Sequence, residues 1–171
     1  VRAHHMYRAQ VDESAWRRGI PGQREHLLGG EDRGVGQRLL FAEAEVAAHE
    51  CADDLRGRVP EVDSIVSIEC EVPEGEAAII CEPWDRKRSP ASRNDAKYSL
   101  PYCLARRLLG RTLDVDDFAG GPVDADAIRL AARITWRPMQ DSGFPARFPA
   151  RLRARLADGR EVVVEVAQVD G

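Results

Sequence analysis

The sequence contains no apolar run that approaches the roughly 20 residues a membrane-spanning helix needs. Its start, VRAHHMYRAQ, lacks the apolar centre of a secretory signal peptide. None of the four cysteines forms a Cys-x-x-Cys pair, the spacing typical of structural zinc sites. These absences argue against a membrane protein, a secreted disulfide scaffold and a zinc protein. We therefore expect a cytoplasmic protein with reduced cysteines, no metal and no cofactor.

A strong charge of one sign is also missing, because 25 basic and 29 acidic residues leave a net charge of −4. The basic residues are not interleaved with aromatic ones, so we expect neither nucleic acid nor an anionic membrane as a partner. The glycine pairs at 29–30 and 120–121 lack the preceding strand and the lysine of a phosphate-binding loop. Apolar residues reach 43%, which is enough for the core of one globular domain.

The chain divides near residue 40. Residues 1–40 combine glycines with many charges and show no sustained hydrophobic period, so we predict loop or disorder there. Residues 41–171 are patterned and form the predicted folded domain. This domain begins with a helix over 42–55, a stretch of helix-forming residues that Gly57 ends.

The middle of the chain predicts one strand and one well-marked helix. Apolar residues alternate over 64–72, which is typical of a half-buried strand. A shorter apolar run at 77–81 is expected to be extended, and the charged, proline-containing segment 82–95 is expected to be a long surface loop. Ser99 has the character of a helix N-cap, and Gly110 ends that helix.

The last third of the chain predicts further helices and a hairpin. Asp114 opens a short helical turn, and Asp124 caps a helix that runs into a strand at 132–136. Two alternating segments, 151–157 and 160–169, are joined by Asp-Gly, a turn signal that requires positive φ. The prediction is therefore a small α+β domain with an antiparallel sheet, a C-terminal β-hairpin and several helices on the sheet.

The segment NDAKYSLPYCL at 94–104 resembles a hallmark of the MmgE/PrpD family, in which Lys or Gln and an aromatic residue precede Ser-Leu-Pro-Tyr at a helix start. Features that accompany this hallmark in the family occur here in order over about 47–171. They are a strand and proline-containing loop at 79–90, an acid-rich helix start at 114–118, a strand at 134–136, and Asp-Gly at 158–159.

The resemblance implies the smaller α+β lid domain of a lyase that acts on small di- or tricarboxylates, as 2-methylcitrate dehydratase and cis-aconitate decarboxylase do. Members of the family place the active site between this lid and a large helical domain. The helical domain would precede residue 1 and a helical tail would follow Gly171, so we expect a helical domain in the same or another chain as partner. The resemblance also implies a homodimer without metal.

His49 and Asp53 match a His and Asp of the family lid, which makes His49 the candidate catalytic residue, a hydrogen-bond donor or a proton carrier with an ordinary pKa of roughly 6.5. The upstream Pro-x-Cys/His element is absent, since that region, RLLFAEAEV, has no proline. Lys97, Arg86 and Arg88 are the candidate carboxylate-binding residues. For all four candidates a plain surface role remains open.

Two functions remain open at this point. The chain is either the lid of a lyase, inactive without a helical domain, or a non-catalytic remnant that serves as a binding or assembly module. Ser99 is expected to be a helix cap rather than a nucleophile, because no His-Asp pair is placed to activate it. Tyr102 is expected to pack with its hydroxyl at the surface.

Overall fold

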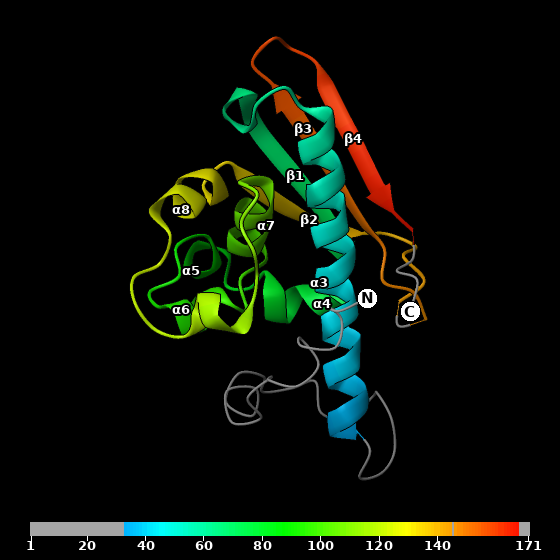
Figure 1. The fold of residues 1–171 in the computed structure, drawn as a ribbon. Helices are drawn as coiled ribbons and strands as arrows, with labels where there is room; N and C mark the ends of the chain where they lie inside the picture. The colour runs from blue at the N-terminus through cyan, green and yellow to red at the C-terminus, as the bar shows by residue number, and fades with distance from the viewer. Residues whose placement is uncertain (1–32, 145, 168–171) are drawn as a thin grey trace.

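The computed structural model describes residues 33–144 and 146–167, and in this part of the chain a long helix, α3 (Arg33–Arg58), lies across a four-stranded sheet (Figure 1). Residues 37–56 contain neither glycine nor proline, which favours one uninterrupted helix. α3 begins well before residue 42, so the prediction of loop or disorder is wrong for 33–40. The rest of that prediction, residues 1–32, lies outside the described residues.

The sheet is mixed, with strand order β2-β1-β3-β4. β1 runs parallel to β2, and Cys70 of β1 lies opposite Trp136 of β2. β1 and β4 each run antiparallel to β3. The strands are β1 (Ile65–Pro73), β2 (Ile134–Met139), β3 (Ala150–Leu156) and β4 (Glu161–Val166). The predicted α+β fold and the C-terminal hairpin are thus confirmed, although the sheet is not wholly antiparallel.

The hairpin between β3 and β4 closes through three residues. Leu156 N donates to Arg160 O over 2.8 Å, and Gly159 N donates to Leu156 O over 3.0 Å. Gly159 has a φ of 86°, as the Asp-Gly signal predicted.

Between β1 and β2 the chain forms short helices where two other structures were predicted. The run 77–81 is not extended, because α4 (Glu74–Ile80) follows Pro73 and buries Ala77 and Ile80. The predicted surface loop 82–95 contains α5 (Trp84–Arg88) and α6 (Arg93–Ala96). These helices are shorter than isolated helices can sustain, so packing on the rest of the domain determines them.

The predicted helix starts after residue 99 are confirmed. Ser99 Oγ accepts a hydrogen bond from Tyr102 N over 3.2 Å at the start of α7 (Leu100–Leu108), and Gly110 follows with a φ of 73°. A capping box between Asp114 and Asp117 begins η2 (Val115–Phe118). Asp124 caps α8 (Ala125–Ala131) through the amides of the first turn.

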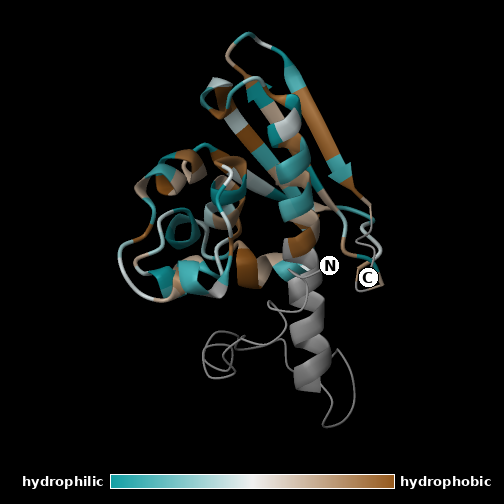
Figure 2. Ribbon diagram, viewed as in Figure 1, coloured by the Kyte–Doolittle hydropathy of each residue, from teal (hydrophilic) through white to brown (hydrophobic). Residues whose placement is uncertain are grey.

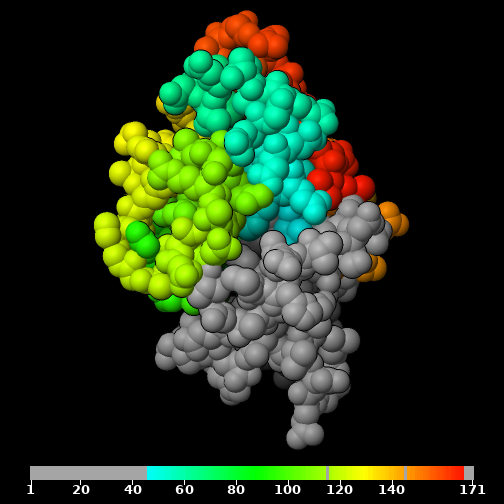
Figure 3. All heavy atoms as spheres, viewed as in Figure 1, coloured from blue at the N-terminus to red at the C-terminus, as the bar shows by residue number. Residues whose placement is uncertain are grey.

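The core lies between the sheet and the helices. α3 packs against β3, β4 and α7, and α7 packs in turn against α8. Figure 2 shows a continuous hydrophobic run in the middle of β4, and Figure 3 shows α3 beside α7 at the surface. Fully buried side chains from each layer meet here, including Leu55, Ile68, Leu104, Leu108 and Leu152. Each contributes about 1.5–3 kcal/mol through burial, so this contact fixes the positions of α3 and α7.

Candidate functional site

His49 lies in the middle of α3, beside α7. Its side chain is half-buried and its Nε2 is buried. Burial, reinforced by the positive charge of Arg107, lowers the pKa of His49 from 6.5 to about 3. Arg107 belongs to α7 and forms an ion pair with Asp53, one turn after His49 on α3. His49 is therefore a neutral imidazole at pH 7, in contrast to the ordinary pKa expected of it.

The middle residue of the basic run 86–88 has a structural role. Lys87 Nζ donates to Ile79 O over 2.5 Å and to Tyr98 O over 2.6 Å. Ser99 Oγ donates in return to Lys87 O over 2.5 Å while capping α7. These hydrogen bonds fix α5 beside the start of α7. They therefore connect α5, which carries Arg86 and Arg88, to the segment before α7 that carries Lys97.

We call the segment from α5 to the start of α7, residues 84–100, the braced unit. The predicted carboxylate-binding residues lie on it. Arg86 is exposed on α5, whereas Arg88 is half-buried and pairs with Asp85 over 2.8 Å. Lys97 is the C-cap of α6, and its Nζ lies 4.9 Å from the centre of the Tyr98 ring. This cation–π contact orients the lysine while leaving its ammonium group able to meet an anion. His49 belongs to a different element, α3.

Tyr102 does not place its hydroxyl at the surface. The side chain is 1% exposed, and its Oη accepts a hydrogen bond from Asp124 N over 3.0 Å. This contact joins α7 to the N-cap of α8, so the prediction of a surface hydroxyl is wrong. The aromatic residue of the Ser-Leu-Pro-Tyr segment instead positions the loop that enters α8.

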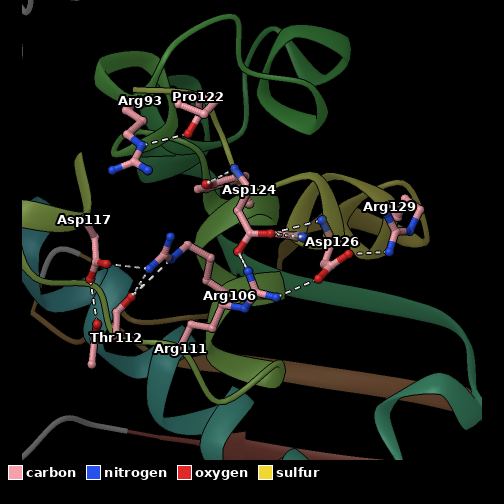
Figure 4. Close-up of polar contacts among 11 residues, drawn as sticks. Arg93, Arg106, Arg111, Thr112, Asp117, Pro122, Asp124, Asp126 and Arg129 are labelled. Atoms are coloured by element: carbon pink, nitrogen blue, oxygen red, sulfur yellow. Dashed lines mark hydrogen bonds and ion pairs between the residues drawn. The ribbon is translucent and has the colours of Figure 1, made fainter. Parts of the chain in front are cut away.

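A cleft of about 580 Å³ opens between α6, the end of α7 and the loop before α8. We call it the arginine cleft, and Figure 4 shows the polar contacts around it. Arg106 and Arg111 bind nearby aspartates, and Arg93 binds a backbone carbonyl. The cleft is lined by Arg93, Arg106, Gly110, Arg111, Thr112, Pro122, Val123 and Asp124.

Sequence reasoning missed the arginine cleft. Arg93, Arg106 and Arg111 are spread over 19 positions and belong to different elements, so no spacing in the sequence marks them as a group. The local signal that was available is the capping aspartate Asp124, which also pairs with Arg111.

The cysteines lie in the interior. Cys51, Cys70, Cys81 and Cys103 are all buried, and within the described part of the chain none is in a disulfide bond. Burial raises the pKa of the Cys51 thiol to about 12 and that of Cys70 well above its ordinary value, so these thiols stay protonated and unreactive. Among the residues whose placement is described, no group of three or more metal-ligating side chains comes together. No helix in this part of the chain is both long and apolar enough to span a membrane.

Comparison with known proteins places this domain. No curated protein matches the sequence significantly. The model of the MmgE/PrpD C-terminal domain matches residues 44–171, which begin within α3 and include the whole sheet, the braced unit at α5–α7 and the arginine cleft. That match covers most of the sequence, and the predicted resemblance is thereby confirmed. The chain belongs to the MmgE/PrpD family, with residues 44–171 as its C-terminal domain.

Proposed function

We propose that this chain supplies the lid of a lyase that removes water or carbon dioxide from a small di- or tricarboxylate. The observation that carries the proposal is the match of residues 44–171 to the C-terminal domain of the MmgE/PrpD family. A substrate with several carboxylates needs cationic groups to hold it, and the exposed Arg86 and the half-buried Lys97 offer such groups. The acid and base groups of the reaction would then come largely from a partner helical domain.

The braced unit supports a substrate-holding role for Lys97. Lys87 and Ser99 fix the backbone that directly follows Lys97 through hydrogen bonds of 2.5–2.6 Å, and the Tyr98 ring orients its ammonium group. A cation held this way loses little conformational entropy when it binds a carboxylate. His49, neutral at pH 7, would contribute a hydrogen bond rather than a charge.

The test combines the full 171-residue chain with the separately produced helical domain of an MmgE/PrpD enzyme. Consumption of 2-methylcitrate and of cis-aconitate is followed by NMR. We expect turnover only when both parts are present. Lys97→Met is expected to raise KM by about tenfold, since a charge-assisted contact contributes at least about 1.4 kcal/mol.

Arg160→Gln is the matched control, because Arg160 is exposed in the β3–β4 turn and pairs with Asp158 over 2.7 Å. It removes one positive charge far along the chain from Lys97 and is expected to leave KM unchanged. Turnover by the chain alone would contradict the proposal that a partner helical domain supplies most of the acid and base groups. An unchanged KM in Lys97→Met would show that Lys97 does not bind the substrate.

A binding or assembly module without catalysis is the second candidate. Two observations favour it: the neutral imidazole of His49 and the absence of a proline in the region RLLFAEAEV, where the family has a Pro-x-Cys/His element. In the same mixing experiment, a stable complex with the helical domain and no turnover of either acid would support this candidate over the first.

A further inference from the structure

Arg93 presents the end of its guanidinium group to the arginine cleft. Its Nε donates to Pro122 O over 2.8 Å, which fixes the plane of the group. The loop beneath it depends on Gly120 and Gly121, whose φ values are 80° and 85°. A Cβ at Gly121 would lie 3.5 Å from Arg93 Cζ, so the loop backbone lies close against the arginine. Within the described part of the chain, Arg93 forms no ion pair.

Arg106 faces Arg93 from the opposite wall. Its Nε and Nη2 donate to Thr112 O over 3.1 and 2.9 Å, and Nη2 also binds Asp117 Oδ1 over 2.7 Å. Figure 4 shows its remaining nitrogen pointing across the cleft toward the end of the Arg93 guanidinium group. The residue is 7% exposed, so this orientation is held by packing as well as by hydrogen bonds.

The charges around the cleft are unevenly distributed. Asp117 neutralises Arg106, while Asp124 and Asp126 both pair with Arg111. Among the described residues, no carboxylate pairs with Arg93, although Arg93 lines the same cleft as Arg106. An anion placed between the two guanidinium groups would pair with the uncompensated charge of Arg93 and accept hydrogen bonds from both.

We propose that the arginine cleft binds a small oxyanion, either a carboxylate or a phosphate group, between Arg93 and Arg106. Both arginines are already oriented by backbone carbonyls, so binding would need little rearrangement. Arginine is the side chain best suited to such groups, because its planar fork matches two oxygens at once. This site does not depend on the proposed lyase function, because its residues are not the proposed substrate-binding ones.

The test titrates the full chain with inorganic phosphate and, in a separate arm, with citrate, at constant ionic strength. Heat of binding and the rise in the thermal unfolding midpoint are both measured. We expect saturable binding by the wild type and about tenfold weaker binding by Arg93→Gln. Binding of phosphate alone would assign a phosphate site, and binding of citrate alone a carboxylate site. Binding of both would assign a general oxyanion site.

Arg155→Gln is the matched control, since Arg155 is an exposed arginine of β3, outside the cleft. It should bind as the wild type does. Arg93→Lys, which keeps the charge and loses the fork, should bind with intermediate affinity and serves if Arg93→Gln does not fold. The proposal is overturned if neither anion binds saturably to the wild type, or if substitution of Arg93 weakens binding no more than substitution of Arg155.

Discussion

His49 illustrates how a residue's surroundings can change the chemistry that its type suggests. Its position on α3 places Nε2 in the interior, and the positive charge of Arg107 on α7 opposes a second positive charge nearby. Both effects favour the neutral imidazole and lower its pKa from 6.5 to about 3. A proton carrier near neutral pH needs a pKa near 7, so His49 in this conformation serves as a neutral hydrogen-bonding group.

This lowered pKa predicts a specific pH dependence of stability. Unfolding restores the ordinary pKa of 6.5, so between about pH 6.5 and pH 3 the unfolded chain binds a proton at His49 that the folded chain does not. His49 therefore contributes stability above pH 6.5 that is lost as pH falls toward 3. Urea denaturation of the wild type and His49→Gln should give a difference in the free energy of unfolding that is constant from pH 7 to 8 and changes steadily below pH 6.

The difference between the two proteins isolates His49 from the aspartates that also titrate in acid. The NMR shift of the His49 ring protons, assigned by their disappearance in His49→Gln, provides an independent measurement. It should stay constant from pH 8 to pH 5. A midpoint near 6.5 in that titration would show that the imidazole is accessible and charged in the folded protein, contrary to its placement here.

At the scale of elements, the sequence predicts those features that depend on contacts between residues close together in the chain. Ser99 and Asp124 were recognised as caps because the hydrogen bonds of a cap reach only two or three residues along the chain. α4 was missed because its short apolar run suits a strand or a buried helix equally well. The parallel pairing of β1 with β2 joins segments more than 60 residues apart, for which no local signal exists.

Two helical glycines allow a matched test of packing. Gly75 on α4 lies beneath the Phe144 ring, where an added Cβ would come within 2.4 Å of Phe144 Cε1. Gly57, near the end of α3, has no atom within 4 Å of the same added Cβ. We predict that Gly57→Ala stabilises the protein by about 0.5–1 kcal/mol through lower backbone entropy in the unfolded chain.

Gly75→Ala gains the same entropy term but has to displace Phe144, whose ring packs edge-on against Phe148 at 5.6 Å between centroids. Overpacking of this kind costs about 1–3 kcal/mol, so the net change should be destabilising. Urea denaturation of both variants measures the two effects. Equal stabilisation by both alanines would show that Phe144 does not rest on Gly75.

At the scale of the whole molecule, the candidate site residues come together through tertiary packing. The family resemblance led to Lys97, through the hallmark at 94–104, and to His49, through the His-Asp pair of the family lid, because both belong to short continuous motifs. The arginine cleft has no such motif, since Arg93 and Arg106 line one cleft only after α6, α7 and the glycine loop have folded against one another. The pairing of Arg107 with Asp53, which shapes the surroundings of His49, likewise depends on the packing of α7 against α3.

The outer face of the sheet carries a row of charges that connects all four strands. Glu71 of β1 lies directly opposite Arg137 of β2 and Arg151 of β3, at 2.6 and 3.1 Å. Arg151 continues the row to Glu165 of β4 at 2.9 Å. The Glu71 side chain is 7% exposed, whereas that of Glu165 is 45% exposed. Desolvation makes the central pairs stronger than surface ion pairs, and it makes an unpaired charge there costly.

We therefore predict unequal effects for two substitutions of the same kind in this row. Glu71→Gln keeps the shape of the side chain but removes the negative charge that pairs with an arginine on each neighbouring strand. It should lower the free energy of unfolding by about 1–3 kcal/mol. Glu165→Gln removes a partner at the exposed end, where water screens the pair, and should change stability by no more than about 0.5 kcal/mol. Urea denaturation at low and at high salt measures both. The Glu71 effect should persist in salt more than the Glu165 effect, because ions screen the charge of a buried carboxylate poorly. Equal effects of the two substitutions would mean that the row acts as a set of independent surface pairs and does not join the strands.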